Sequence, residues 1–213
     1  SKYSWFNLGG PADIFFRPAN KNQLKEFLNQ IRENSNSIKI LGAGSNTLIR
    51  DGGIKGIVIK LSSNFSSVKL ISPNIIEVGA ATLDRNVSEF AKNNEISEME
   101  FLSCIPGSIG GAIIMNSGCY GSDISKILLS IKVLDNLGNE KEINSEEIKF
   151  CYRGSNLPKN FIILSAKLKG ISSSKAFIEK KQNQLIQKKN YLNPVRLKQG
   201  EAHLKTIPIK KHG

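Results

Sequence analysis

The amino-acid sequence predicts a mixed α+β fold followed by a basic C-terminal appendage. Three observations carry this prediction: an amphipathic helix between two short apolar strands near the N-terminus, a second amphipathic helix before a glycine-rich stretch, and a hairpin pattern after that stretch. Apolar residues recur at helical spacing in the helices and in short runs in the strands. A chain of 213 residues has room for one domain with sub-lobes, and no internal repeat is visible.

The first elements predict a β-α-β unit. A turn at residues 8–12 leads into a strand at 13–17, which Pro18 ends. Asn20 is the expected N-cap of a helix from Lys21 to about Glu33, because four apolar residues recur on one face: Leu24, Phe27, Leu28 and Ile31. A buried strand at residues 38–41 completes the unit.

A glycine loop, Gly42-Ala43-Gly44-Ser45-Asn46, follows that strand. It begins like the dinucleotide fingerprint G-x-G-x-x-G, but Thr47 stands where the third glycine belongs, and a strand at residues 56–61 follows in place of a helix. No Lys-Ser or Lys-Thr pair follows, so a P-loop is excluded. The pattern indicates a nest of backbone N–H groups that binds phosphate oxygens without a helix dipole.

The later elements are a strand, a helix, a hairpin, a further strand and a basic helix. The strand covers residues 75–78, and the helix that ends near Asn94 is marked by four apolar residues: Leu83, Val87, Phe90 and Ala91. Residues 131–135 and 140–143 are expected to pair as a hairpin around residues 136–139. After a polar interruption at 150–155 come a buried strand at 161–167 and a basic helix at 175–189.

The stretch from residue 100 to residue 121, EFLSCIPGSIGGAIIMNSGCYG, is unusually rich in glycine. Glycine gives up side-chain burial and loses more backbone entropy on folding than other residues, so an ordinary core element does not favour it. Residues 105–112 are therefore interpreted as a loop built to hold a large ligand. A set of tight turns between strands is the alternative explanation.

Composition and charge limit the classes of protein to which this chain can belong. The chain is 39% hydrophobic and 23% charged, has no apolar run near the roughly 20 residues that span a bilayer, and begins without a signal-peptide pattern. We therefore expect a cytoplasmic protein with no membrane partner. The net charge is +12, but the last 45 residues hold eleven Lys and Arg against two Glu, so the body is nearly neutral. The three cysteines are widely spaced, which indicates no disulfide framework and no metal site, and we expect them to be small buried residues.

Four motifs in order resemble one family, the bacterial flavoenzymes called UDP-N-acetylenolpyruvoylglucosamine reductase or UDP-N-acetylmuramate dehydrogenase. The motifs are LGGPADIFFRP from residue 8, LGAGSNTLIRDGGIKGIVI from residue 41, the stretch 100–121, and FCYRGS from residue 150. The resemblance runs from about residue 8 to residue 168. Glycine loops alone are weak evidence, whereas four spaced motifs are specific.

The resemblance implies a two-lobed FAD-binding fold of the vanillyl-alcohol oxidase type, with a substrate domain that is largely missing here. It implies lobes at residues 1–63 and 64–170, with 171–213 as a remnant. The cofactor-binding residues it implies lie in two segments, each close enough to the ligand to need small residues: Gly42, Ala43, Gly44, Ser45, Asn46 and Thr47, then Ile105, Pro106, Gly107, Ser108, Gly110, Gly111 and Ala112.

The resemblance also implies a reaction. In the family, NADPH reduces the flavin, which passes hydride to UDP-N-acetylglucosamine enolpyruvate and gives UDP-N-acetylmuramate for peptidoglycan. Hydride attack on the vinyl group builds an enolate, and a fixed cation stabilises that charge. Arg153 matches the family's catalytic Arg, and Tyr152 lies beside it as a substrate-binding residue. The implied partner is a small molecule, not nucleic acid, and the implied state is a monomer.

Past residue 168 the resemblance breaks. The family needs a proton-donor Ser and a C-terminal Glu, and nothing after Leu168 matches them. For one set of codons that the observed residues permit, one nucleotide restored after the Lys198 codon turns the final residues into a sequence that contains Gly-Ser-Thr-Phe-Lys-Asn. We therefore interpret 198–213 as out of frame, through a truncating frameshift or a sequencing error. We therefore expect impaired turnover.

Two other functions stay open at this point. One is a different FAD-dependent oxidase of the same fold, which is disfavoured because both histidines, His203 and His212, fall in the basic tail rather than near a flavin loop. The other is a basic module that binds nucleic acid without catalysis, which lacks interleaved aromatic and basic residues. Bound flavin in the purified protein separates the first from the second.

Overall fold

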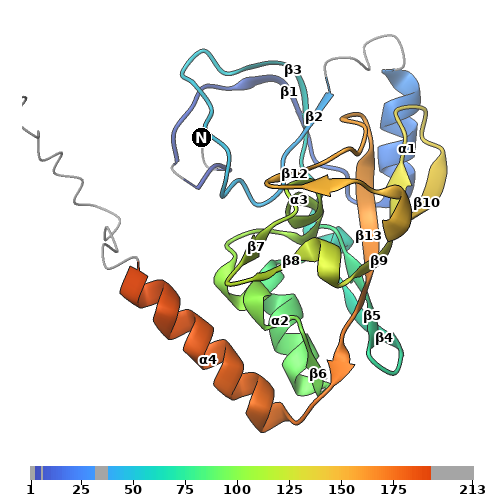
Figure 1. Ribbon diagram of the computed structural model, residues 1–213. Coiled ribbons are helices and arrows are strands. Elements are labelled where there is room, and N and C mark those ends of the chain that lie inside the picture. Colours follow the sequence, from blue (N-terminus) through green and yellow to red (C-terminus); the bar gives the residue numbers. More distant parts are fainter. Residues whose placement is uncertain (1–2, 6, 32–37, 193–213) are drawn as a thin grey trace, which may run out of the picture.

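The computed structural model describes residues 3–5, 7–31 and 38–192 and has the predicted α+β character (Figure 1). The first half contains β1 (Ala12–Phe16), α1 (Lys21–Gln30), β2 (Ile38–Ile40), β3 (Ile54–Ile59), β4 (Val68–Ser72), β5 (Ile75–Gly79), α2 (Asp84–Asn93), β6 (Ile96–Ser97) and the 3-10 helix η3 (Glu100–Cys104). The second half contains α3 (Ile109–Ile114), β7 (Gly118–Cys119), β8 (Ser122–Asp123), β9 (Leu128–Leu134), β10 (Glu140–Asn144), β11 (Phe150–Cys151), β12 (Gly154–Ser155), β13 (Ile162–Lys169), β14 (Ile171–Ser172) and α4 (Lys175–Leu192). Residues 198–213, predicted to be out of frame, lie outside the described residues.

The N-terminal strands form a small parallel sheet of order β1-β3-β2. Asn20 caps α1 as predicted, since its side-chain oxygen accepts a hydrogen bond from the backbone N–H of Gln23 at 2.9 Å. The predicted β-α-β connection is present, but β3 lies between its two strands. The helix ends at Gln30, before the predicted end near Glu33, which falls outside the described residues.

The second sheet is antiparallel and has the order β10-β9-β13-β5-β4. The predicted hairpin is confirmed as β9 and β10, and the predicted strand at residues 161–167 is confirmed as β13. Strand β4 was not predicted from the sequence; it is an edge strand whose middle residues are exposed. Strand β13 lies in the centre of the sheet and joins the β4–β5 hairpin to the β9–β10 hairpin.

One large hydrophobic core covers a face of this sheet, between its strands and α2, α3 and η3. A second cluster joins Leu24 and Leu28 of α1 to Ile59 of β3 and Ile162 of β13, so α1 connects the two sheets. Helix α4 runs along the outside of α2 and η3 (Figure 1). Over the described residues, no helix is long and apolar enough to cross a membrane.

Two expectations about local structure were wrong. Residues 105–112 were interpreted as a loop, but α3 begins at Ile109, because Ile109, Ala112 and Ile113 pack into the core at helical spacing despite two neighbouring glycines. The cysteines were expected to be buried, yet Cys151 is exposed, because it belongs to the short surface hairpin of β11 and β12.

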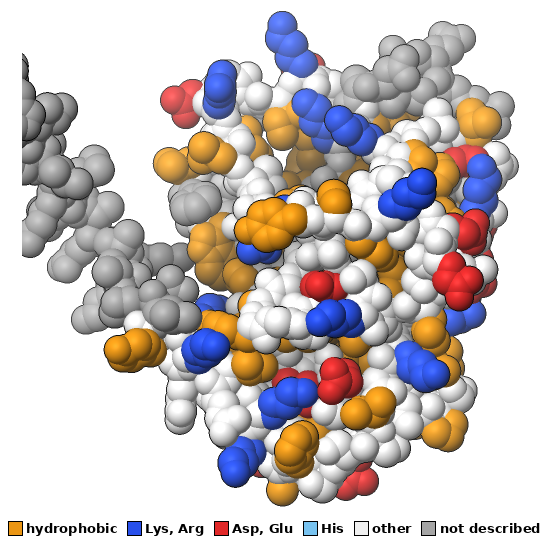
Figure 2. Space-filling view, in the orientation of Figure 1, with side chains coloured by type: hydrophobic (Ala, Val, Ile, Leu, Met, Phe, Trp, Pro, Cys, Tyr) orange, Lys and Arg blue, Asp and Glu red, His pale blue; other side chains and the backbone are white. Residues whose placement is uncertain are grey.

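Hydrophobic side chains remain exposed around the small sheet. In Figure 2 the upper part of the molecule, where Figure 1 places β1, β2 and β3, shows hydrophobic side chains beside a hollow. Several large ones in this part of the chain are exposed: Trp5, Leu8, Ile14, Phe15, Ile40 and Leu48. This sheet therefore has apolar surface that the described residues do not cover.

Candidate functional site

The two glycine-bearing segments, which come from different sheets, meet at one place in the structure. A Cβ added to Gly42 would lie 2.9 Å from the hydroxyl oxygen of Ser108 and 4.0 Å from the Cα of Gly111. At Gly111, leaving aside its chain neighbours and the backbone of its own helix, the only atom of the described residues within 4 Å of an added Cβ is the same Ser108 oxygen, at 3.9 Å, so open space adjoins this glycine. We call Gly42, Ser108 and Gly111 the cradle. Ser108 occupies the space beside Gly42, so the open space of the cradle lies beside Gly111.

Gly44 has a structural reason to be glycine. Its φ is +75°, and an added Cβ would lie 2.4 Å from the backbone oxygen of Tyr3, while its own carbonyl accepts a hydrogen bond from the N–H of Trp5 at 3.0 Å. The N-terminal segment therefore packs on this loop and fixes its path. No helix follows the loop, as the sequence predicted.

Two cations stand beside the same loop. The ammonium group of Lys60, which follows β3, donates a hydrogen bond to the carbonyl oxygen of Gly42. Burial lowers the pKa of Lys60, and the positive charge of nearby Arg17 lowers that pKa further. Two like charges held this close favour an anion between or beside them.

The second glycine segment, residues 105–112, is held in place by the residues that precede α2. The backbone N–H of Ile109 donates to Thr82 at 3.0 Å, and that of Gly110 donates to Ala80 at 2.9 Å. Leu83 and Ser108 form an isolated antiparallel bridge. The path of residues 105–110 is therefore set by residues 80–84.

Helix α3 connects the cradle to a pocket. Its N-terminal end follows Ser108, and its C-terminal end receives the hairpin of β11 and β12, because the Ser155 hydroxyl donates to the carbonyl of Ile114 at 3.2 Å. The Asn116 amide donates to the carbonyl of Cys151 at 3.5 Å. Six helical residues rise about 9 Å along the axis. The cradle and the pocket thus lie at opposite ends of the short helix α3.

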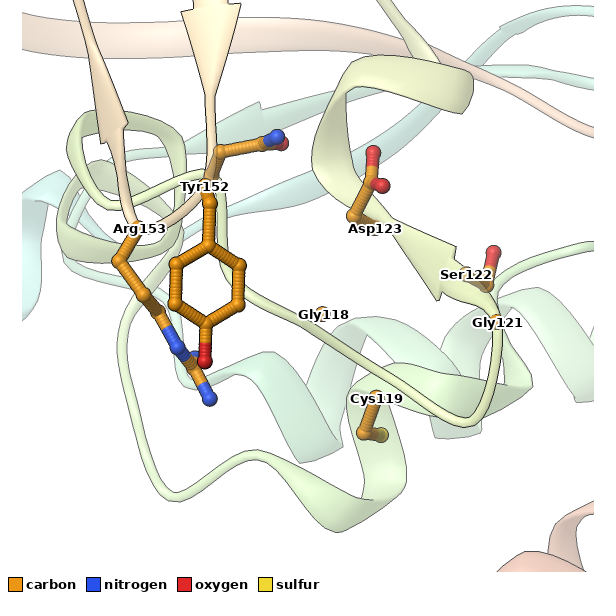
Figure 3. Close-up of a pocket in the computed structure, with 8 residues that line it drawn as sticks. Gly118, Cys119, Gly121, Ser122, Asp123, Tyr152 and Arg153 are labelled. Atoms are coloured by element: carbon orange, nitrogen blue, oxygen red, sulfur yellow. The ribbon is translucent and has the colours of Figure 1, made fainter.

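The pocket has a volume of about 370 Å³ and is lined by the predicted catalytic residue Arg153 and the predicted substrate-binding residue Tyr152 (Figure 3). Tyr152 and Arg153 lie on one side of it, with Ser122 and Asp123 on the other. The remaining lining residues are Asn116, Gly118, Cys119 and Gly121. The guanidinium carbon of Arg153 is 5.7 Å from the centre of the Tyr152 ring, within the range of a cation–π contact. Tyr152 is 90% exposed and Arg153 is exposed as well, so both side chains are accessible to a ligand.

The electrostatics of the pocket are mixed. Burial raises the pKa of the Cys119 thiol to about 11, helped by the neighbouring Cys104, whereas the positive charges of Lys189 and Arg153 act in the opposite direction. Cys119 is therefore a neutral thiol at physiological pH, within the electrostatic influence of two cations. The pocket favours a negatively charged ligand group on the Arg153 side.

The sequence predicted both glycine segments and the Tyr152 and Arg153 pair, and the structure brings the two segments together. It does not place Arg153 at the cradle itself but beyond the far end of α3. Sequence reasoning missed Lys60, Asn116, Cys119 and Asp123. Of these, Asn116 and Cys119 lie inside the glycine-rich stretch that was singled out, whereas Lys60 contacts a residue 18 positions earlier and carried no local signal.

Comparisons with known proteins point in one direction. Residues 12–144 match the family described as "FAD binding domain". The chain is 43% identical over 197 residues to the UDP-N-acetylenolpyruvoylglucosamine reductase of Pelagibacter ubique (strain HTCC1062), covering 92% of this chain and 65% of that protein. It is 41% identical over 202 residues to the reductase of the same name from Rickettsia typhi (strain ATCC VR-144 / Wilmington), covering 95% of this chain and 68% of that protein.

A solved structure agrees with these relatives. The crystal structure of UDP-N-acetylenolpyruvylglucosamine reductase from Thermus caldophilus superposes with a TM-score of 0.77 at 28% identity, covering 89% of this chain and 66% of that chain. The chain thus spans about two thirds of the length of the relatives that it matches.

Proposed function

The chain belongs to the UDP-N-acetylenolpyruvoylglucosamine reductase family, and from this premise we propose that it binds FAD and serves the reduction of UDP-N-acetylglucosamine enolpyruvate to UDP-N-acetylmuramate in peptidoglycan synthesis. NADPH is the proposed hydride donor. The observation that carries the proposal is the meeting of two glycine segments at Gly42, Ser108 and Gly111, linked by α3 to the pocket of Arg153.

The residues present fit FAD. A Cβ at Gly42 would lie 2.9 Å from the Ser108 hydroxyl oxygen, so glycine at position 42 lets the two segments meet closely, and the open space beside Gly111 lets a ligand approach the backbone. Lys60 and Arg17 supply positive charge beside the loop, which suits the two phosphates of FAD. We propose that all the predicted residues of 42–47 and 105–112, except Ile109, line the cofactor, and that residues 1–63 and 64–170 are the two lobes around it.

FAD supplies the hydride-transfer chemistry when it is bound, and the protein's residues bind and orient. Arg153 is the proposed cation for the substrate carboxylate, because its planar guanidinium binds a carboxylate through two parallel hydrogen bonds. Tyr152 packs against that guanidinium and restricts where it points. We further propose a cytoplasmic monomer that acts on a small molecule, with neither nucleic acid nor a membrane as partner.

The expectation of impaired turnover concerns residues that the structure does not describe, and it stays a prediction. Binding is therefore the sharper test. The purified chain is mixed with FAD, and the visible spectrum and flavin fluorescence are followed after removal of free cofactor. NADPH and the UDP-sugar are then added separately. Retained yellow flavin that NADPH reduces supports the proposal, whereas a colourless protein after loading defeats it.

Lys60→Met tests the phosphate assignment against a control, Lys55, on the strand that Lys60 follows. We expect FAD to bind at least about tenfold more weakly, because a charged contact to phosphate contributes about 1.5–3 kcal/mol. Riboflavin, which has no phosphate, should lose much less affinity. Lys55→Met removes an exposed lysine from β3 and should leave both affinities unchanged. An equal loss for FAD and riboflavin would place Lys60 away from the phosphates.

A further inference from the structure

A carboxyl group without a partner is buried beside the predicted cofactor segment. Asp84, the first residue of α2, has 0% of its surface exposed, and neither of its carboxyl oxygens has a hydrogen-bond partner among the described residues. An unpartnered polar group in a protein interior destabilises the fold, because it loses its hydrogen bonds to water without replacement. A buried carboxyl group that destabilises the fold therefore points to a structural or functional role at this position.

The contacts of Asp84 are to one residue of the cofactor segment, Gly107. The backbone N–H of Asp84 donates to the carbonyl of Gly107 at 3.1 Å. A Cβ added to Gly107 would lie 2.5 Å from Oδ2 of Asp84, closer than real Cβ contacts occur, while the next atoms, Cγ of Asp84 and Cγ2 of Ile105, lie 3.6 Å away at ordinary contact. The carboxyl group therefore occupies the space that a side chain at position 107 would need.

The charge state of Asp84 fits this packing role. Burial raises the pKa of its carboxyl to about 8, so the group is neutral at physiological pH. The segments packed against it, residues 80–83 and 105–112, contain no ionisable side chain. On α2 itself the nearest charged groups, Arg85 and Glu89, are exposed. A neutral carboxyl packs against backbone without the desolvation penalty of a charge.

We propose that Asp84 is a positioning residue of the cofactor site, and that position 107 is glycine because Asp84 fills the adjoining space rather than because the cofactor needs it. Asp84 then fixes the path of residues 105–108, and through Ser108 it sets the width of the cradle at Gly42. The effect on cofactor affinity rests on the proposed function, whereas the packing of Asp84 on Gly107 does not.

Four proteins test this: the parent, Gly107→Ala, Asp84→Ala and the double variant. Gly107→Ala should lower the melting temperature and weaken FAD binding at least tenfold, because its methyl group clashes with the carboxyl. The double variant should recover most of both losses, because alanine at position 84 removes the clashing oxygen. Asp84→Ala alone should fold, since it removes an unpartnered buried group, and should weaken FAD binding a few-fold by loosening the segment.

The control pairs Asp84→Ala with Gly111→Ala, whose added Cβ meets no atom of Asp84. This pair should show additive effects and no recovery. A double variant at 84 and 107 that is as weak as Gly107→Ala alone, in both stability and affinity, overturns the proposal and leaves the cofactor as the reason for glycine at position 107. Recovery of the melting temperature in flavin-free protein supports the packing even if the parent fails to bind FAD, in which case only the proposed function is lost.

Discussion

Arg153 has a backbone conformation that its residue type disfavours. Its φ is +59°, and it occupies the second position of the two-residue turn between β11 and β12, where a positive φ usually selects glycine or asparagine. A non-glycine residue in this region costs of order 1 kcal/mol or more. The guanidinium stands at a pocket and not in an ion pair that the structure describes. The strain therefore favours a functional reason for arginine at this position.

Replacing Arg153 with glycine separates function from stability. Arg153→Gly should leave the melting temperature unchanged or slightly higher, because glycine adopts a positive φ without steric cost. It should keep FAD bound yet lower the UDP-sugar-dependent oxidation of NADPH by about a hundredfold or more, as expected when a preorganised electrostatic contact is lost.

The measurement is the affinity of FAD-loaded protein for the UDP-sugar together with turnover. Arg153→Lys serves as the comparison, since it keeps the charge but loses the planar fork, and should fall between the parent and the glycine variant. A folded glycine variant with parental substrate affinity and turnover would remove Arg153 from the site.

Residues recognised by a motif could be predicted, and residues recognised only by a distant contact could not. Arg153 carried a sequence signal because FCYRGS surrounds it. Lys60 and Asp84 carried none, because their contacts are to Gly42 and Gly107, 18 and 23 positions away in the chain. The residues next to Lys60 and Asp84 in the sequence do not indicate these long-range contacts, so the contacts can be found only in the folded structure.

Among the elements, α3 is a helix that could not be predicted from the sequence, because its residues lie in a glycine-rich stretch. Glycine disfavours a helix by about 1 kcal/mol relative to alanine, and two glycines in six residues suggest a loop. Burial of Ile109, Ala112 and Ile113 in the main core outweighs that preference. Strand β4 was missed for the opposite reason, since its exposed middle residues give it little buried apolar pattern.

The two glycines of α3 should respond to alanine with opposite signs. Gly111→Ala should stabilise the flavin-free protein by up to about 1 kcal/mol, because its added Cβ meets only the Ser108 oxygen at 3.9 Å and alanine favours a helix. The same methyl group should weaken FAD binding, since it enters the cradle. Thermal denaturation with and without FAD measures both effects.

Gly110→Ala is the matched comparison in the same helix. Its added Cβ would lie 3.2 Å from the Cβ of Ala80, so it should lose stability even without flavin. If Gly111→Ala leaves FAD affinity unaltered, the cofactor does not pass beside this helix.

For the whole molecule, the α+β class followed from periodicity and the flavin-binding architecture from the four motifs. The sheet order did not follow. Nothing in residues 162–169 indicates that this strand enters between β9 and β5, because both pairings are long-range and each strand is simply a short apolar run.

The free energy of unfolding of the whole molecule should depend on pH through Asp84. Its pKa is about 8 in the folded state against the ordinary value of 3.8, so the folded protein retains a proton that the unfolded chain has released. That contribution is complete below about pH 4 and is lost as the pH rises to about 8, at a rate on the order of 1 kcal/mol per pH unit.

Asp84→Asn removes this titration at nearly constant size. Urea denaturation of parent and variant at several pH values between 5 and 9 should show the parent losing its relative stability up to about pH 8 and no further change above it. Parallel curves for the two proteins across this range would show that the carboxyl does not titrate as described.

The central place of β13 has a consequence during synthesis. The β4–β5 and β9–β10 hairpins are complete by residue 144, but the strand that joins them ends at Lys169. Until then each hairpin presents an unpaired inner edge, and exposed edges are templates for association with other chains. A nascent chain that stalls before β13 has emerged from the ribosome therefore exposes both edges to association, whereas a chain in which β13 has emerged can close them.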